Sequence, residues 1–123
     1  MADLIVEGDE LVVRLRPLQK LAAFHGDVRV PLTAVRGVFA VEKPWLALRG
    51  RRMAGTALRG VAAMGTWIHG DRLYDFCVVR AQLKAVQVDL NAGRYSRLLV
   101  CVPDETDIQA EARRLAAAAG IAG

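Results

Sequence analysis

The stretch AVQVDLNAGRYSRLLVCVPD, residues 85–104, decides the fold class. Apolar and polar residues alternate on both sides of the short segment Asn91-Ala92-Gly93. Alternation with a period of two is typical of a strand with one buried face, and a glycine-containing turn between two such strands is typical of a β-hairpin. Pro103 ends the second strand, because proline cannot donate a hydrogen bond to a ladder. The stretch therefore predicts an antiparallel hairpin.

Upstream of this hairpin, short segments repeat the same pattern. Residues 72–80, RLYDFCVVR, are rich in β-branched and aromatic side chains, and residues 11–15, 28–30 and 35–41 alternate in polarity. Turn residues separate these segments, as between the strands of a small β-fold. The chain therefore predicts six or seven short strands.

Two segments carry helical signals instead. Residues 17–26 begin with proline and end with glycine, so they predict one to two helical turns or a compact loop. Their apolar stripe is Leu18, Leu21 and Ala22. Residues 104–119 predict an amphipathic helix with Asp104 as the N-cap and Gly120 as the terminator. Its apolar face is Ile108, Ala112, Leu115 and Ala119.

Strands followed by one helix, without a βαβ rhythm, predict a mainly β protein. We expect a single domain, residues 1–123, built as a small antiparallel barrel or pair of sheets that the helix 104–119 caps. The predicted core is Leu11, Val13, Val28, Val30, Val35, Phe39, Val86, Val88, Leu98, Val100, Ile108 and Leu115.

Composition and cysteine usage predict a cytoplasmic location. The amino terminus, MADLIVEGDELVV, is acidic where a secretory signal would be basic, and no uncharged stretch is long enough for a membrane helix. Cys77 and Cys101 both lie in apolar runs, so we expect reduced, unreactive thiols in the core.

The positive charge is concentrated in residues 49–70, RGRRMAGTALRGVAAMGTWIHG. This segment has four arginines, no acidic residue and a glycine at every fifth position. The formal net charge of +4 equals these four arginines, since the other basic residues balance the acids. We expect Gly55, Gly60 and Gly65 to bend the chain between two short strands. The four arginines are expected to form one basic surface patch: Arg49, Arg51, Arg52 and Arg59.

Residues 25–35 (HGDVRVPLTAV), 49–56 (RGRRMAGT) and 85–104 resemble an uncharacterised family of small bacterial pleckstrin-homology-like (PH-like) proteins. The resemblance implies a barrel of seven antiparallel strands in two near-orthogonal sheets, with a carboxyl-terminal helix at one end. It implies no activity, because bacterial members of this fold mostly lack an assigned function. No lipid-headgroup residue is carried over, since the phosphoinositide pattern of basic residues is not reproduced near residues 14–29.

The sequence disfavours catalytic and metal chemistry. Gly50 and Gly55 have the spacing of a phosphate-binding loop, but no lysine follows. His25 and His69 each precede a glycine, which is typical of turns, and the single serine, Ser96, is in a strand without a nucleophile elbow. No cluster has metal-ligand spacing. We therefore expect no catalytic residue, no metal and no cofactor.

Two classes of function remain. The leading one is a non-catalytic binding or scaffolding module that meets another protein or a second copy of itself through a sheet edge or the basic segment. The alternative is a binder of an anionic lipid headgroup or a phosphorylated molecule at the four arginines. Nucleic acid is disfavoured, because few aromatic residues accompany the basic ones.

Overall fold

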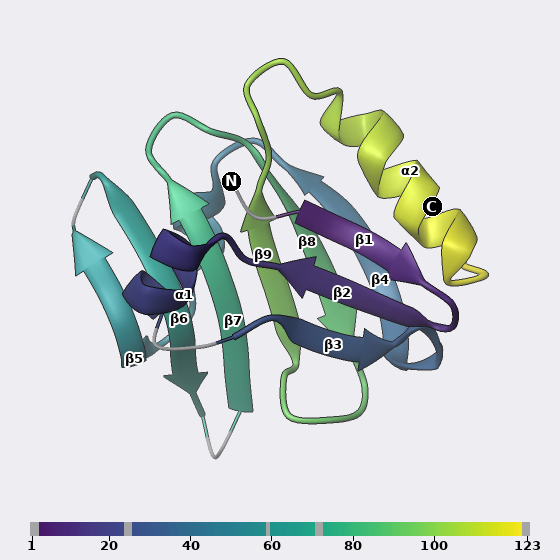
Figure 1. Cartoon of the computed structure of the whole chain (residues 1–123), viewed down its shortest axis with the longest axis horizontal. Coiled ribbons are helices and arrows are strands. Elements are labelled where there is room, and N and C mark those ends of the chain that lie inside the picture. The colour runs from purple at the N-terminus through teal and green to yellow at the C-terminus, as the bar shows by residue number, and fades with distance from the viewer. Residues whose placement is uncertain (1–2, 24–25, 59, 71–72, 122–123) are drawn as a thin grey trace.

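The computed structural model describes residues 3–23, 26–58, 60–70 and 73–121. These residues contain nine strands and a helix near each end of the chain (Figure 1). The strands are β1 (Asp3–Glu7), β2 (Glu10–Arg14), β3 (Val28–Pro31), β4 (Val35–Val41), β5 (Arg51–Leu58), β6 (Ala62–His69), β7 (Leu73–Arg80), β8 (Ala85–Leu90) and β9 (Arg97–Cys101). The helices are α1 (Pro17–Ala23) and α2 (Ile108–Ala118), with 3-10 turns η1 (Leu32–Ala34) and η2 (Pro44–Ala47).

The described strands form two sheets, neither of which closes into a barrel. β1, β2 and β3 make a three-stranded antiparallel sheet, and the other strands follow the order β4-β8-β9-β7-β6-β5. Figure 1 shows the smaller sheet lying across the larger one. The mainly β class, the pair of sheets and the carboxyl-terminal helix are confirmed. The barrel alternative is wrong, because neither sheet closes, and the described residues contain nine strands rather than about seven.

One strand pair is parallel. β9 pairs antiparallel with β8, as the hairpin predicts, but its other neighbour is β7, and these two strands run in the same direction. Residues 81–84 connect β7 to β8 without pairing them, and β9 fills the space between. Alternating polarity predicts a strand and its buried face but does not predict the neighbouring strand. The expectation of a purely antiparallel fold is therefore corrected.

The connection between β4 and β5 joins the two opposite edges of the larger sheet. It contains η2, and Trp45, Ala47 and Leu48 within it pack against the core. Arg97 of β9 donates a hydrogen bond to the Ala47 carbonyl oxygen at 3.4 Å. Arg97 and Leu98 are consecutive in β9, so their side chains point to opposite faces of the sheet, and Leu98 faces the smaller sheet. The connection therefore crosses the other face, which we call the outer face.

A large part of the core lies on the inner face of the larger sheet, toward β1–β3. The buried side chains on this face include Phe76, Val78, Val86, Val88, Leu98 and Val100. Every predicted core residue is buried except Phe39, whose exposed fraction is 48%. A bulge between Val35 and Gly37 interrupts the alternation of β4, so Val38 is buried in place of Phe39.

The carboxyl-terminal helix is shorter than expected. α2 begins at Ile108, and its N-cap is Asp107, which accepts hydrogen bonds from the backbone N–H groups of Gln109 and Ala110 at 3.1 Å. Residues 104–106 form a turn, so the assignment of Asp104 as the N-cap is wrong. The predicted face is confirmed at three positions and includes Ala116: the buried residues are Ile108, Ala112, Leu115 and Ala116.

The short helix α1 does not turn its two leucines toward the core. Leu18 and Leu21 are 80% and 70% exposed, whereas Gln19 and Ala23 are buried. Gln19 is the third residue of the helix, and its side-chain oxygen accepts a hydrogen bond from the Arg16 N–H at 3.0 Å. This contact is half of a capping box, and it turns Gln19 inward. The expected apolar stripe of α1 therefore faces outward.

The glycine-rich segment is one hairpin of two eight-residue strands rather than two weak, bent ones. Gly60 lies in the turn, and Gly55 and Gly65 pair across the middle of the ladder. Thr56 on the inner face of β5 donates a hydrogen bond to the Ala22 carbonyl oxygen at 2.6 Å, which places α1 over β5. No helix within the described residues has the length and apolar character needed to cross a membrane.

Candidate functional site

The structure does not bring the three described arginines of the predicted patch onto one face. Arg51 and Arg52 are the first two residues of β5, and both are exposed. They pair with Ile68 and Trp67 respectively, so their side chains leave the strand on opposite faces. Arg49 precedes the strand and contacts the outer face, and Arg59 lies outside the described residues. Their role in binding stays a prediction.

Arg49 is held by a buried carboxylate. Its Nε and Nη2 donate hydrogen bonds to Oδ2 and Oδ1 of Asp75 at 2.8 and 2.7 Å. His69 Nε2 lies 3.1 Å from the same Oδ1, and the Ser96 hydroxyl is 3.5 Å from it. The Asp75 side chain is 1% exposed and that of Arg49 is 35% exposed. This group, the Asp75 cluster, is Asp75 with Arg49, His69 and Ser96.

The electrostatics of the Asp75 cluster follow from this geometry. Hydrogen bonding to Asp75 raises the pKa of the Arg49 guanidinium, against the opposing effect of partial burial. Two parallel N–H···O bonds between a guanidinium and a carboxylate are strong and fix the relative orientation of both groups. Because both oxygens of Asp75 accept hydrogen bonds, the carboxylate orients Arg49 and His69.

The sequence contains a signal for this cluster. Asp75 stands inside the apolar run LYDFCVV, where β7 is buried on both faces. A charged group in such a position requires a partner, because burying an unpaired charge is very costly. The sequence therefore predicts a cationic partner for Asp75, but it does not single out Arg49, because Arg72 and Arg80 lie closer along the chain.

Asp75 also belongs to a polar row across the outer face. The strand registers place one residue of each strand from β8 to β5 side by side: Asp89, Arg97, Asp75, Trp67 and Arg52. Arg97 Nε donates a hydrogen bond to Asp89 Oδ1 at 2.9 Å. Negative and positive side chains alternate over the first three positions, an arrangement that stabilises neighbouring strands. Arg49 and Arg97 together fasten the β4–β5 connection to this face.

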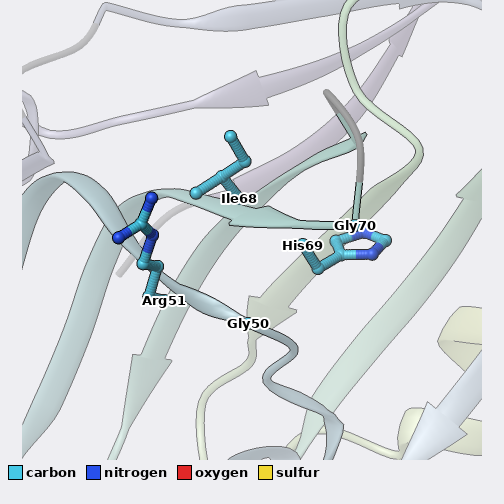
Figure 2. A pocket seen from close by; sticks show the side chains of 5 residues that line it. All are labelled: Gly50, Arg51, Ile68, His69 and Gly70. Atoms are coloured by element: carbon cyan, nitrogen blue, oxygen red, sulfur yellow. The ribbon is translucent and has the colours of Figure 1, made fainter.

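A surface pocket of about 330 Å³ lies beside the Asp75 cluster, where the β5–β6 hairpin opens. Its lining is Gly50, Arg51, Ile68, His69 and Gly70 (Figure 2). Figure 2 shows the Arg51 guanidinium and the His69 ring extending away from each other. The strand register explains this, because Arg51 and Ile68 share the inner face and His69 lies on the outer one. The two basic side chains therefore do not converge on one ligand position.

Both cysteines are buried thiols, in agreement with the expectation. Burial raises the pKa of the Cys77 thiol, and the nearby Asp75 carboxylate raises it further. Burial also raises the pKa of the Cys101 thiol. Because the thiolate is the reactive form, both groups are poor nucleophiles in the folded protein.

Within the described residues, no three His, Cys, Asp or Glu side chains come close enough together to hold a metal ion. His25, which was expected at a turn, lies outside these residues. No protein-family model, curated protein or solved structure matches the chain. The PH-like resemblance therefore stays a prediction.

Proposed function

We propose that the protein is a non-catalytic binding module that pairs with a second copy of itself along the outer edge of β5. One observation carries this proposal: β5 is a terminal strand of the larger sheet, with β6 on one side and none of the other described strands on the other. A strand edge with unpaired N–H and C=O groups is a template for pairing with another chain.

The side chains of β5 suit such pairing. Arg51, Arg52 and Met53 at one end and Ala57 and Leu58 at the other are exposed. Leu58 is 57% exposed and Met53 is 52% exposed. Exposed apolar side chains beside an open edge favour contact with another protein surface. A bulge between Arg52 and Ala54 limits regular pairing to residues 54–58.

The distribution of charge on β5 favours a second copy in the antiparallel direction. Both cationic side chains lie at the amino end of the strand, and its carboxyl end is apolar. Antiparallel pairing of residues 54–58 places the arginine end of each copy beside the Leu58 end of the other. Parallel pairing would place arginines beside arginines, and like charges in direct opposition destabilise a sheet. An antiparallel pair also has the two-fold symmetry common to homodimers.

Light scattering coupled to gel filtration, over a range of protein concentrations, tests the proposal. We expect the mass to approach twice the chain mass of 13.4 kDa as concentration rises. Leu58→Glu should strengthen the dimer, because the carboxylate would lie near the arginines of the other copy. Leu58→Lys should weaken it for the opposite reason.

Leu46→Glu and Leu46→Lys are matched controls. Leu46 is 82% exposed and lies in η2, away from β5, so neither substitution should change the dimer dissociation constant. A wild-type chain that stays monomeric at all concentrations would refute self-pairing. A dimer that responds equally to both charges at position 58 would show that another surface forms it. Capture of an acidic extended peptide by a monomer would reassign the edge to a different protein.

The alternative, an anionic ligand at the four arginines, has less support. Arg49 is engaged by Asp75, and Arg51 and Arg52 point to opposite faces of the sheet. An anion that contacts several arginines requires them to converge on one position.

A further inference from the structure

A second pocket, of about 470 Å³, lies between α1 and the strands β6 and β7. Its apolar walls are Pro17, Leu18, Ala22 and Met64, and its polar lining is Arg16, Gln19 and Arg80. Sites for small organic molecules are mostly apolar and have volumes of about 300–1,000 Å³. The size and the composition of this pocket, which we call the α1 pocket, both suit such a ligand.

The orientation of α1 creates the apolar wall. The hydrogen bond from the Arg16 N–H to Gln19 keeps Gln19 inward, and Leu18 consequently stands at the mouth of the pocket with 80% of its surface exposed. A ligand in the pocket that covers Leu18 removes this apolar surface from water, which favours binding.

The charges around the α1 pocket select the class of ligand. Two arginines line it, Arg16 and Arg80, and both are exposed. No acidic residue is among the described lining residues. Guanidinium groups match carboxylates in shape and charge, and they bind them through paired hydrogen bonds. Apolar walls with a cationic rim complement an alkyl chain that ends in an acid.

We propose that the α1 pocket binds a small acidic amphiphile, namely an alkyl carboxylate. The chain lies against Leu18, Ala22 and Met64, and the carboxylate contacts Arg16 and Arg80. No lining residue belongs to β5, so the proposal is independent of pairing along that edge. The cations involved are also not those of residues 49–59, where an anionic ligand was first expected.

Isothermal titration calorimetry with decanoate, decanol and acetate tests this assignment on the full chain. Decanoate should bind with one site per chain, below its micelle concentration. Decanol should bind about tenfold more weakly, because it lacks the charge-assisted hydrogen bonds. Acetate should show no heat of binding, since it lacks the apolar chain. Addition of decanoate should leave the mass of the protein unchanged, which separates this site from the β5 edge.

Two surface variants locate the site. Arg80→Gln should weaken decanoate about tenfold and leave decanol unchanged, because the guanidinium contacts only the carboxylate. Leu18→Gln should weaken both ligands. Leu46→Gln, at a leucine of matched 82% exposure in η2, should change neither. Equal affinity for decanoate and decanol, or no loss in Arg80→Gln, would overturn the proposal. An acidic amphipathic peptide that binds at Leu18 where decanoate does not would also overturn it, in favour of a protein partner.

Discussion

Gly55 and Gly65 lie directly opposite each other in the β5–β6 ladder, and both have a positive φ, +111° and +131°. A methyl group added at Gly55 would overlap the Met64 carbonyl oxygen, and one added at Gly65 would overlap the carbonyl oxygen of Ala54. The two backbones thus approach too closely for any side chain at this point. Only glycine combines the positive φ with the missing Cβ.

Gly55→Ala and Gly65→Ala should therefore each destabilise the protein by about 3 kcal/mol or more, from backbone strain and overlap together. Gly60→Ala is the control. Gly60 also has a positive φ, +77°, but an added Cβ would meet no atom within 4 Å, so its cost should be about 1 kcal/mol. Urea unfolding measures all three. Equal losses at the three positions would show that close approach of the strands is not what requires glycine.

The spacing of the glycines was visible in the sequence, but its cause was not. Gly50 and Gly70 flank the open end of the hairpin, Gly60 lies in its turn, and Gly55 and Gly65 pair in its middle. A repeat of five thus marks one symmetric hairpin with eight-residue strands. Glycine indicates where the chain can bend or approach another segment, and only the partner strand distinguishes the two cases.

The Asp75 cluster allows a test of whether loss of Arg49 or loss of Asp75 destabilises the protein more. Arg49→Met leaves a carboxylate that is 1% exposed without its guanidinium, and we expect a loss of about 3 kcal/mol. Asp75→Asn should cost less, because Arg49 is 35% exposed and can turn toward water. The double variant should be more stable than Arg49→Met alone, since it removes the buried unpaired charge.

Thermal unfolding followed by circular dichroism measures these differences. Arg52→Met serves as the control, because Arg52 is exposed and its replacement should change stability by no more than about 0.5 kcal/mol. A double variant that loses the sum of the two single losses would show that Arg49 and Asp75 do not act as a pair.

The candidate sites show the limit of reading this chain from its sequence. Local periodicity predicted most of the strands, the hairpin of β8 and β9 and most of the core, because these depend on neighbours in the chain. The α1 pocket depends on Gln19 turning inward and on Met64 and Arg80 arriving from two other strands. Leu18 and Leu21 have helical spacing whether they face the core or the solvent, so the sequence could not distinguish these orientations.

The buried thiols make stability depend on alkaline pH. The pKa of Cys77 and that of Cys101 are raised in the folded protein, mainly by burial. Thiols in the unfolded chain lose their protons from a pH of about 8.5, whereas the folded protein retains them. The thiol contribution to stability is thus complete below that pH and is lost as pH rises, by up to about 1.4 kcal/mol per pH unit for each group.

Between pH 7.5 and pH 10 the wild type should therefore lose more stability than Cys77→Ala does. Urea unfolding at several pH values measures the difference in the free energy of unfolding between the two proteins. The effects of other groups that titrate at alkaline pH cancel in this difference. Parallel pH curves would show that the Cys77 thiol does not contribute.

The start of α2 depends on Asp107 and not on Asp104, although both precede the helix and both are exposed. The Asp107 carboxylate satisfies two backbone N–H groups that have no partner within the helix, those of Gln109 and Ala110. Asp107→Ala should cost about 1 kcal/mol in the free energy of unfolding, and Asp107→Ser should restore most of it, because a hydroxyl can also accept these bonds. Asp104→Ala should change stability by less than about 0.5 kcal/mol. Since Leu115 and Ala116 hold α2 on the core, the cap should affect the whole protein, so global unfolding should report its loss. A larger loss at Asp104 than at Asp107 would move the N-cap back to the position expected from the sequence.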